Sequence, residues 1–213
     1  MYVPNHFHQP DPNEAVALIR RVVLGELVTF DGSGLVATPL PMIYDASVAT
    51  DGALLGHVAR ANPQWRSFAG GVEALAIFRG PGAYVSPSWY PTKSEDGKVV
   101  PTWDYATVHV YGQLVVHDDE AWKRTLVTRL TDQQEHLKDR PWAVSDAPER
   151  YVTGLLRGIV GVELRITRME AKWKLSQNEL ERNRAGVVSG LQAEEEPEAR
   201  AVAHMIRALP GGP

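Results

Sequence analysis

Near the start of the chain, apolar residues recur at the three- and four-residue spacing of a helix that buries one face. Asp11 and Pro12 precede this run, and Glu14 stands three residues after Asp11. A capping side chain, a proline at the first helical position and a capping-box glutamate are typical of a helix N-terminus. The pattern predicts a helix that begins at Pro12 and ends at Gly25. Its apolar positions are Ala15, Val16, Leu18, Ile19, Val22 and Val23.

After this helix the pattern changes to short runs of strand-forming residues separated by turn signals. Asp31-Gly32-Ser33-Gly34 and Thr50-Asp51-Gly52 predict turns, and Asn62-Pro63 predicts the start of a short helix that ends at Phe68. Gly80-Pro81-Gly82 predicts a break between two strands. The predicted strands are residues 26–30, 35–44, 53–59, 72–78 and 84–89. This succession indicates a meander of antiparallel strands.

The second half contains two long strand patterns and several helical ones. Strands are predicted at 103–116 and 160–169, helices at 119–137 and 148–157, and a polar loop at 92–100. In the last of these strands Val160, Val162, Leu164 and Ile166 alternate with Gly161, Glu163, Arg165 and Thr167, so the first set is expected in the core and the second in solvent.

The chain from Ser176 onward is helical and polar, and the run Glu194-Glu195-Glu196-Pro197 separates two predicted helices. The strands do not alternate regularly with helices, which favours a closed or split antiparallel barrel over a parallel sheet. We therefore predict a mainly β fold with peripheral helices, of the α+β class. A barrel domain is expected at residues 1–170, with a C-terminal helical extension at 171–213 packed on it.

The strand at 103–116 sorts its side chains into two chemically different faces. One face is aliphatic, with Ala106, Val108, Val110, Leu114 and Val116. The other combines flat rings with hydrogen-bonding tips, and consists of Trp103, Tyr105, Thr107, His109, Tyr111 and Gln113. This second face suits a planar heteroaromatic ligand or an aromatic-rich dimer interface, and it equally suits a partly exposed sheet face.

A second candidate site lies where a predicted strand ends and a short helix begins. The run from Gly56 to Trp65 contains His57, Arg60, Asn62 and Gln64. Backbone N–H groups at a helix start, together with an arginine, can bind a phosphate. Taken alone, the same run is also compatible with a capped helix and a surface arginine.

Two further groups of polar residues have ligand-binding chemistry. Lys174-Leu175-Ser176-Gln177-Asn178 places a cation, a hydroxyl and two amides at a strand-to-helix junction, where they could contact a phosphate or a flavin edge, or where Ser176 could simply cap a helix. His6 and His8 could face the same way, but no third ligand accompanies them, so no metal site is predicted.

Composition and charge narrow the class of protein. The 213 residues include no cysteine, which excludes disulfides and thiolate metal sites and is compatible with the cytoplasm, where we expect the protein. No stretch predicts a membrane span or a secretion signal. The net charge of -4 argues against a DNA-binding surface. Phosphate-binding glycine loops and nucleophile motifs are missing from the sequence, so no catalytic residue is assigned.

Several segments, in order, resemble the PaiB family of FMN-binding split-barrel proteins. They are Met1-Tyr2-Val3-Pro4-Asn5-His6-Phe7, the run from Gly56-His57 to Ala61-Asn62-Pro63-Gln64-Trp65, Gly80-Pro81 with Tyr84-Val85-Ser86-Pro87-Ser88-Trp89-Tyr90, Val100-Pro101-Thr102-Trp103 with Val108-His109, and Lys174-Leu175-Ser176-Gln177-Asn178. The resemblance covers about residues 1–208. It implies a split barrel that holds FMN at the interface of a homodimer, and a role in negative transcriptional regulation or redox sensing. The regulatory label makes DNA a possible partner, which the net charge does not support.

The predicted cofactor contacts combine the segments that resemble the family with the candidate sites described above, from which Tyr105 is taken. They are His57, Arg60, Asn62, Gln64, Trp65, Trp103, Tyr105, His109, Lys174, Ser176, Gln177 and Asn178. The family commonly has asparagine where this chain has Asp104, and histidine where it has Pro39. A carboxylate close to a flavin would disfavour the anionic reduced ring.

A neighbouring branch of the family offers an alternative. It resembles haem proteins, including piperazate synthases, which form an N–N bond on a hydroxylated ornithine. In that alternative haem b replaces FMN and His57 is the axial ligand. The segment Ser86–Tyr90 and the motif Lys174–Asn178, which that branch tends to alter, favour FMN as the first choice.

Overall fold

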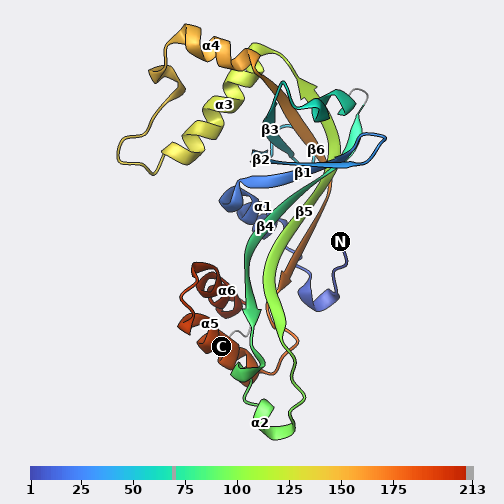
Figure 1. Cartoon of the computed structure of the whole chain (residues 1–213), viewed down its shortest axis with the longest axis vertical. Helices are drawn as coiled ribbons and strands as arrows, with labels where there is room; N and C mark the ends of the chain where they lie inside the picture. The colour runs from blue at the N-terminus through green and yellow to red at the C-terminus, as the bar shows by residue number, and fades with distance from the viewer. Residues whose placement is uncertain (69–70, 210–213) are drawn as a thin grey trace. The chain divides into compact units, whose positions relative to one another are not determined.

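The computed structural model describes residues 1–68 and 71–209 and is drawn in Figure 1. The strands are β1 (Leu24–Phe30), β2 (Leu35–Asp45), β3 (Ala53–Ala59), β4 (Val72–Val85), β5 (Thr102–His117) and β6 (Ile159–Lys174). The α-helices are α1 (Pro12–Val22), α2 (Lys93–Asp96), α3 (Glu120–Glu135), α4 (Glu149–Arg157), α5 (Glu181–Ala193) and α6 (Pro197–Ala208). Short 3₁₀ helices are η1 (Asn5–Phe7), η2 (Pro63–Phe68), η3 (Pro87–Trp89) and η4 (Val144–Asp146).

The strands close into one barrel in the order β1-β2-β3-β6-β5-β4. β1 and β2 form a hairpin that turns between Phe30 and Leu35, and β1 also pairs antiparallel with β4. β3 lies between β2 and β6, antiparallel to both, with His57 opposite Gly161. The predicted mainly β split barrel with peripheral helices is confirmed.

The chain divides into two compact units. Unit 1 comprises residues 1–15, 79–108 and the chain from Glu170 onward, and unit 2 comprises residues 16–78 and 109–169. The unit boundaries fall inside α1, β4, β5 and β6, so each of these elements contributes residues to both. The predicted domain division at residues 170/171 stays a prediction.

The first helix begins as its sequence predicts and ends early. The Asp11 carboxylate accepts a hydrogen bond from the backbone N–H of Asn13 at 2.8 Å, and Pro12 is the first helical residue. Val23 has a φ of 58°, a left-handed conformation that no regular helix continues through. The helix therefore stops at Val22, and Gly25, where we predicted its end, already belongs to β1.

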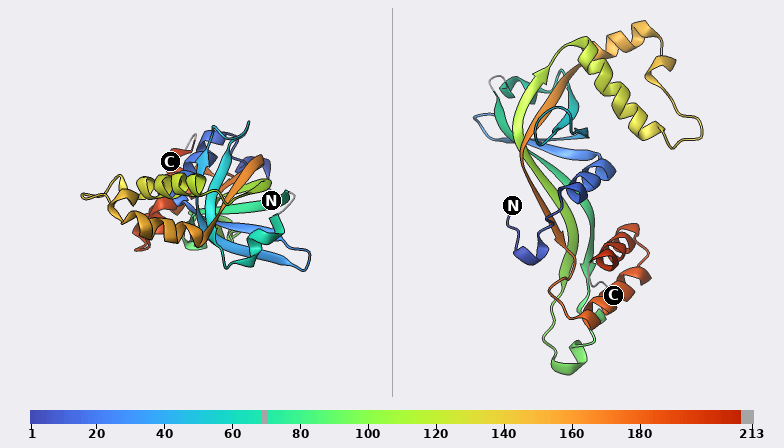
Figure 2. Two further views of the ribbon diagram at one scale, coloured as in Figure 1. Left: turned by 90° about the horizontal axis from the view of Figure 1, so that it is seen from above. Right: turned by 180° about the vertical axis from the view of Figure 1, so that it is seen from behind.

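In unit 2, α3 covers the face of the sheet formed by β2 and β3. Asp119 caps this helix by accepting the Trp122 N–H at 2.8 Å. Leu126 of α3 packs against Ile43, Ala53 and Leu55, and this cluster is buried. The hairpin of α3 and α4 is visible in both views of Figure 2. Apolar burial of this kind fixes which sheet face is covered.

In unit 1, α5 and α6 pack on each other and α5 receives an aromatic side chain in a glycine notch. A Cβ atom on Gly190 would stand 2.1 Å from the Trp89 indole, and one on Gly186 would stand 2.0 Å from the Trp89 carbonyl oxygen. Side chains at these two positions would collide with η3. The helices on either side of the predicted acidic break are present as α5 and α6.

Several other predicted element boundaries were wrong. β4 runs unbroken through Gly80-Pro81-Gly82, where a break was predicted; the Gly82 N–H reaches Glu198 at 3.4 Å, so this part of the strand has a hydrogen-bond partner outside the sheet. The segment after Val85 forms η3, and the predicted polar loop contains α2. β6 continues to Lys174, five residues beyond its predicted end.

Two residues depart from the predicted solvent face of β6. Gly161 is buried, and a Cβ atom there would stand 2.2 Å from the Trp122 ring. Glu163 is buried as well. Its side chain is only 5% exposed, because Oε2 lies 2.9 Å from His117 Nε2 and Oε1 accepts a hydrogen bond from Arg165 Nε at 2.7 Å. His117 in turn stacks on Trp122 with 4.1 Å between ring centroids. A carboxylate can be buried when both oxygens have partners, and alternation alone does not reveal those partners.

Within the described ranges 1–68 and 71–209, none of the helices has the length and apolar character needed to cross a bilayer.

Candidate functional site

Burial along β5 confirms the predicted alternation of faces. Ala106, Val108, Val110 and Leu114 are buried, whereas Trp103 is 59% exposed. Tyr105, His109 and Tyr111 are half-buried, and Gln113 is exposed. Thr107 is the exception on the aromatic face, because its side chain is buried. The strand thus presents a row of partly exposed rings, as a ligand-binding face requires.

In unit 1, Trp103 of this row forms an exposed aromatic pair, and Tyr105 has a cation next to its ring. The Tyr84 and Trp103 rings meet edge to face with 6.2 Å between centroids, and both are about half exposed or more, at 48% and 59%. Lys172 Nζ lies 5.4 Å from the centre of the Tyr105 ring. Such geometry is favourable for a cation and an aromatic ring. Sequence reasoning missed Lys172, although its spacing of two from Lys174 places both on one side of β6.

Asp104 lies on the opposite side of β5 from Trp103 and Tyr105, and it is completely buried, at 0% exposure. Ser176 Oγ donates to Asp104 Oδ2 at 2.6 Å, and Lys174 Nζ lies 3.5 Å from Oδ1. Burial raises the pKa of Asp104, while Ser176 and Lys174 oppose that rise. The Asp104 carboxylate therefore lies on the opposite side of β5 from the ring face. The expectation that it would stand close to a flavin bound on that face, and disfavour the anionic reduced ring, is not supported.

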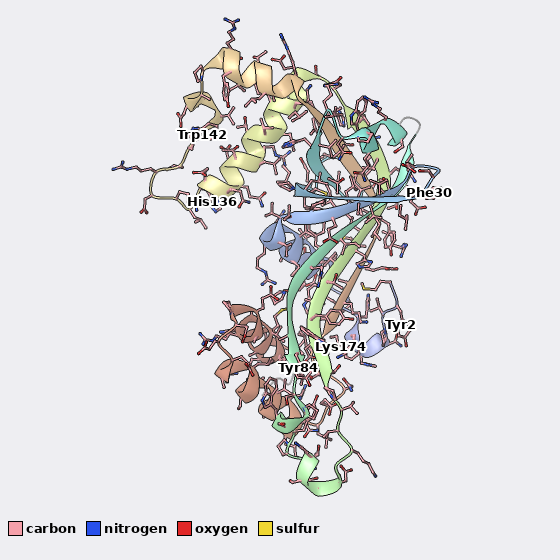
Figure 3. All side chains as sticks on the ribbon, viewed as in Figure 1. Tyr2, Phe30, Tyr84, His136, Trp142 and Lys174 are labelled. Atoms are coloured by element: carbon pink, nitrogen blue, oxygen red, sulfur yellow. The ribbon has the colours of Figure 1, made fainter. Side chains whose placement is uncertain are left out.

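The Lys174 ammonium forms its hydrogen bonds with residues of unit 1, the unit to which Lys174 itself belongs. Its ammonium donates to Thr102 Oγ1 at 2.6 Å and to the Trp103 carbonyl oxygen at 2.5 Å, besides its contact with Asp104. The Phe7 ring lies 5.7 Å away. Lys174 and Tyr84 are labelled in Figure 3, on β6 and β4 respectively. An ammonium group has three donors, so these three oxygens can account for all of them.

The other residues of the Lys174–Asn178 motif close the turn after β6. Ser176 has a φ of 58°, and its hydroxyl also hydrogen-bonds to Tyr90. The Gln177 amide donates to the Trp173 carbonyl at 2.6 Å and accepts the Leu175 N–H at 2.7 Å. Asn178 is exposed and its amide reaches Glu179 at 3.4 Å. Ser176 does not cap α5, because that helix begins after Leu180.

Tyr90 completes the buried polar cluster of unit 1. It is 5% exposed, and burial together with the nearby charges of Glu179 and Asp104 raises its pKa to about 12. The cluster, which we call the Asp104 cluster, consists of Tyr90, Thr102, Asp104, Lys174 and Ser176. It joins three of the segments in this unit that resemble the PaiB family: 84–90, 100–103 and 174–178.

In unit 2, the predicted phosphate-binding arginine has protein partners. Both terminal nitrogens of Arg60 contact the Asp118 carboxylate, and its Nε donates to the Arg157 carbonyl at 2.7 Å. Lys123 Nζ lies 2.9 Å from the same carboxylate. These charges lower the pKa of Asp118 to about 2. The partner Asp118, 58 residues away, could not be inferred from the sequence around Arg60.

The other predicted residues of this segment also bond within unit 2. Gln64 is buried and donates to Thr29 Oγ1 at 3.0 Å, and the Trp65 indole donates to the Arg60 carbonyl at 3.0 Å. Asn62 accepts the Gln64 N–H at 3.0 Å, so it caps η2 as predicted, and donates to Thr38 at 3.2 Å.

Two buried polar atoms of unit 2 have no hydrogen-bond partner among the described residues. They are His57 Nδ1 and Gln64 Oε1. Burial lowers the pKa of His57, which favours its neutral imidazole. His109 lies near Tyr111, with 6.4 Å between ring centroids, and Arg168 is stacked 3.7 Å from the Tyr111 ring centre. Unsatisfied buried acceptors or donors are often completed by a ligand or water.

These observations test whether the residues fit FMN. The ring faces of Trp103 and Tyr105 with Lys172 fit a planar, electron-poor ring that becomes anionic on reduction. The orphaned nitrogen of His57 fits a polar ring edge. Arg60 fits a phosphate only if it exchanges Asp118 for the ligand. Taken by itself, unit 1 thus has groups that suit the ring of FMN, and unit 2, taken by itself, has an arginine that is already paired and does not offer a free cation to its phosphate.

Comparisons with known proteins agree with this chemistry. Residues 1–168 match the protein family described as "Putative FMN-binding domain". The chain is 32% identical over 206 residues to the Bacillus subtilis "Protease synthase and sporulation protein PAI 2", covering 97% of this chain and 96% of that protein.

Solved structures share the fold at low sequence identity. The FAD and haem binding protein from Mycobacterium smegmatis has a TM-score of 0.55 at 16% identity, over 78% of this chain and 73% of that one. The flavocytochrome Anf3 from Azotobacter vinelandii has a TM-score of 0.54 at 12% identity, over 81% and 72%. The family match and the Bacillus relative together show that this chain belongs to the PaiB family of FMN-binding-domain proteins.

Proposed function

We propose that this protein binds FMN on its split barrel and works as a homodimeric, redox-responsive flavoprotein. The observation that carries the proposal is the family match over residues 1–168. It is supported by the half-exposed rings of β5, which face away from the barrel core. FMN, when bound, supplies reversible one- and two-electron chemistry.

In unit 1, Trp103 and Tyr105 are the proposed ring contacts. The exposed indole of Trp103 offers a flat apolar surface, and Tyr105 offers a second ring close to the Lys172 ammonium. A positive charge next to a flavin favours the anionic reduced ring, so Lys172 is expected to favour reduction. These residues bind and orient the cofactor, and none of them is assigned a proton-transfer step.

In unit 2, the segment from His57 to Trp65 and the side chain of His109 remain separate predicted contacts. His57 can offer its unsatisfied Nδ1 to a polar ring edge. Arg60 remains the predicted phosphate ligand, and binding a phosphate would require it to give up part of its pairing with Asp118. Replacing Arg60 by alanine therefore tests the prediction, since unchanged FMN affinity would remove Arg60 from the site.

The absorption spectrum of the purified protein tests the cofactor. We expect the two visible bands of an oxidised flavin and release of FMN on denaturation. A Soret band in their place would favour haem b, the second candidate, which is motivated by the neutral, half-buried imidazole of His57. A colourless protein that takes up neither FMN nor haemin would overturn both.

The dimer and the regulatory role are tested apart from the cofactor. Sedimentation or light scattering should give about twice the 23.5 kDa chain mass, and a monomer at working concentration would contradict the homodimer. The net charge of -4 predicts no sequence-specific DNA binding by the chain itself. A gel shift at physiological salt that survives competitor DNA would refute that expectation and favour direct transcriptional regulation.

A further inference from the structure

Trp103 combines an exposed side chain with a backbone that a buried polar cluster holds in place. We propose that Lys174 and Asp104 are positioning residues that fix Trp103 at the ring-binding face and do not themselves contact the flavin. The flavin part of this inference rests on the proposed function, whereas the positioning of Trp103 does not. All the residues involved lie in unit 1.

The first step concerns the donors of Lys174. Its ammonium meets Thr102 Oγ1 at 2.6 Å, the Trp103 carbonyl oxygen at 2.5 Å and Asp104 Oδ1 at 3.5 Å. Three acceptors for three N–H donors leave no further hydrogen bond for a ligand. The bond to the Trp103 carbonyl acts on the backbone from which the indole projects.

The second step concerns what holds Lys174. Asp104 is 0% exposed, and its second carboxylate oxygen accepts the Ser176 hydroxyl at 2.6 Å. Ser176 is itself tied to buried Tyr90. Buried polar groups with a complete set of partners have little freedom to move. The ammonium is therefore held from the protein side by groups on β5, on the turn after β6 and on the residue after η3.

The third step concerns the indole. On the exposed side, Trp103 has the Tyr84 ring at its edge, 6.2 Å between centroids, and it remains 59% exposed. A side chain with that much exposure owes its orientation largely to its backbone and this one ring. Loosening the Lys174 bond should therefore change the mobility of Trp103 more than that of the other tryptophans.

Fluorine NMR tests the positioning without any flavin. The six tryptophans are labelled as 5-fluorotryptophan, and Trp103→Phe assigns its resonance. Lys174→Met is expected to shift and broaden the Trp103 resonance, while Lys174→Arg, which keeps donors, retains most of the wild-type signal. Lys98→Met is the matched control, because Lys98 is an exposed lysine with the same charge and no bond to Trp103. In the Lys98→Met variant the Trp103 resonance should be the same as in the wild type.

An unmoved Trp103 resonance in Lys174→Met would overturn the inference. If Lys174→Met unfolds the protein, all six resonances collapse together, and Lys174→Gln becomes the deciding variant under the same criterion. An equal disturbance of all the tryptophans in a folded variant would also contradict a specific effect on Trp103.

A double-mutant cycle on FMN affinity then separates positioning from direct contact. Lys174→Met should weaken FMN binding about tenfold in the wild-type background and hardly at all in a Trp103→Ala background, because interacting residues are non-additive. Lys172→Met, proposed as a direct electrostatic contact, should weaken binding by the same factor in both backgrounds. Equal losses for Lys174→Met in both backgrounds would show direct contact and refute positioning.

The fluorine NMR experiment and the FMN titrations distinguish failure of the positioning role from failure of the proposed function. Absence of FMN binding by the wild-type protein would remove the proposed function, yet the fluorine resonance would still report on Lys174 and Trp103. FMN binding with a Trp103 resonance indifferent to Lys174 would keep the function and remove the positioning role.

Discussion

Asp104 in unit 1 and Asp118 in unit 2 are both carboxylates paired with lysine, and their pKa values move in opposite directions. Asp104 is 0% exposed and its pKa is raised, because burial outweighs Lys174 and Ser176. The Asp118 side chain is 56% exposed, and Arg60 and Lys123 lower its pKa to about 2. The comparison shows that a nearby cation lowers the pKa of an exposed carboxyl group, whereas burial of the carboxyl group can outweigh the same kind of cation and raise its pKa.

The difference in solvent exposure also predicts how much each ion pair contributes to the stability of the fold. A buried charge that loses its partner has no water to replace it, whereas an exposed charge is solvated and screened. The Asp104 cluster should therefore be sensitive to substitution, and the Arg60–Asp118 pair tolerant.

Lys174→Met should have the largest effect. It leaves Asp104 buried without a cation, and breaking a buried pair in this way typically costs about 3 kcal/mol of the free energy of unfolding. Urea denaturation at neutral pH measures the loss. The double variant Asp104→Asn, Lys174→Met should recover a large part of it, and a full loss that Asp104→Asn does not relieve would contradict the proposed cause.

The pH dependence of Asp104 should be the next largest effect. Because its folded-state pKa lies above the ordinary value of 3.8, the stability from its protonation is present below pH 3.8 and is lost as the pH rises through the folded-state pKa. Asp104→Asn, which cannot ionise, should therefore gain on the wild type as the pH rises through that range. Stability curves that stay parallel from pH 3.5 to 8 would be inconsistent with a raised pKa.

Tyr90 should titrate late in alkaline solution. Its pKa of about 12 lies above the ordinary value of 10, so the protonated phenol stabilises the fold below pH 10 and this contribution is lost between pH 10 and 12. Ultraviolet absorption of phenolate, compared between wild type and Tyr90→Phe, isolates its titration. A Tyr90 signal that appears near pH 10 in the folded protein would contradict the burial argument.

Arg60→Ala should have the smallest effect on stability. Its pairing with Asp118 is exposed, and salt at about 1 M should abolish most of the difference from wild type. Since the pKa of Asp118 is lowered from 3.8 to about 2, its contribution is present above pH 3.8 and lost as the pH falls through 2. Thermal unfolding at low and high salt measures this. A loss as large as that of Lys174→Met would erase the contrast between the two regions.

Local pattern predicted most of the fold. Alternation along β5 predicted its buried aliphatic face and its ring face, and the cap at Asp11 and the acidic break before Pro197 located helix starts. These features depend on residues only a few positions apart, so they can be recognised in the sequence itself. The continuity of β4 through Gly80-Pro81-Gly82 was missed, because the local glycine and proline signal indicates a turn and does not reveal contacts such as that of Gly82 with Glu198, 116 residues away.

The candidate site was less predictable for the same reason. The sequence indicated that Arg60 and Lys174 are cations with binding chemistry, but not that Asp118 and the Asp104 cluster already engage them. Lys172 was overlooked because its candidacy as a flavin contact depends on its position next to the Tyr105 ring, which belongs to another strand. Glu163 was assigned to solvent because its partner His117 lies on β5. In each case a contact distant in sequence decides the role of the residue.

The most direct test of flavin binding is a calorimetric titration of the FMN-free protein, with Trp103→Ala as comparison. We expect saturable binding of one FMN per chain that is weakened in Trp103→Ala, while riboflavin, which lacks the phosphate, binds more weakly than FMN. No heat of binding with FMN, or equal affinity in wild type and Trp103→Ala, would contradict a flavin held against the ring face of β5.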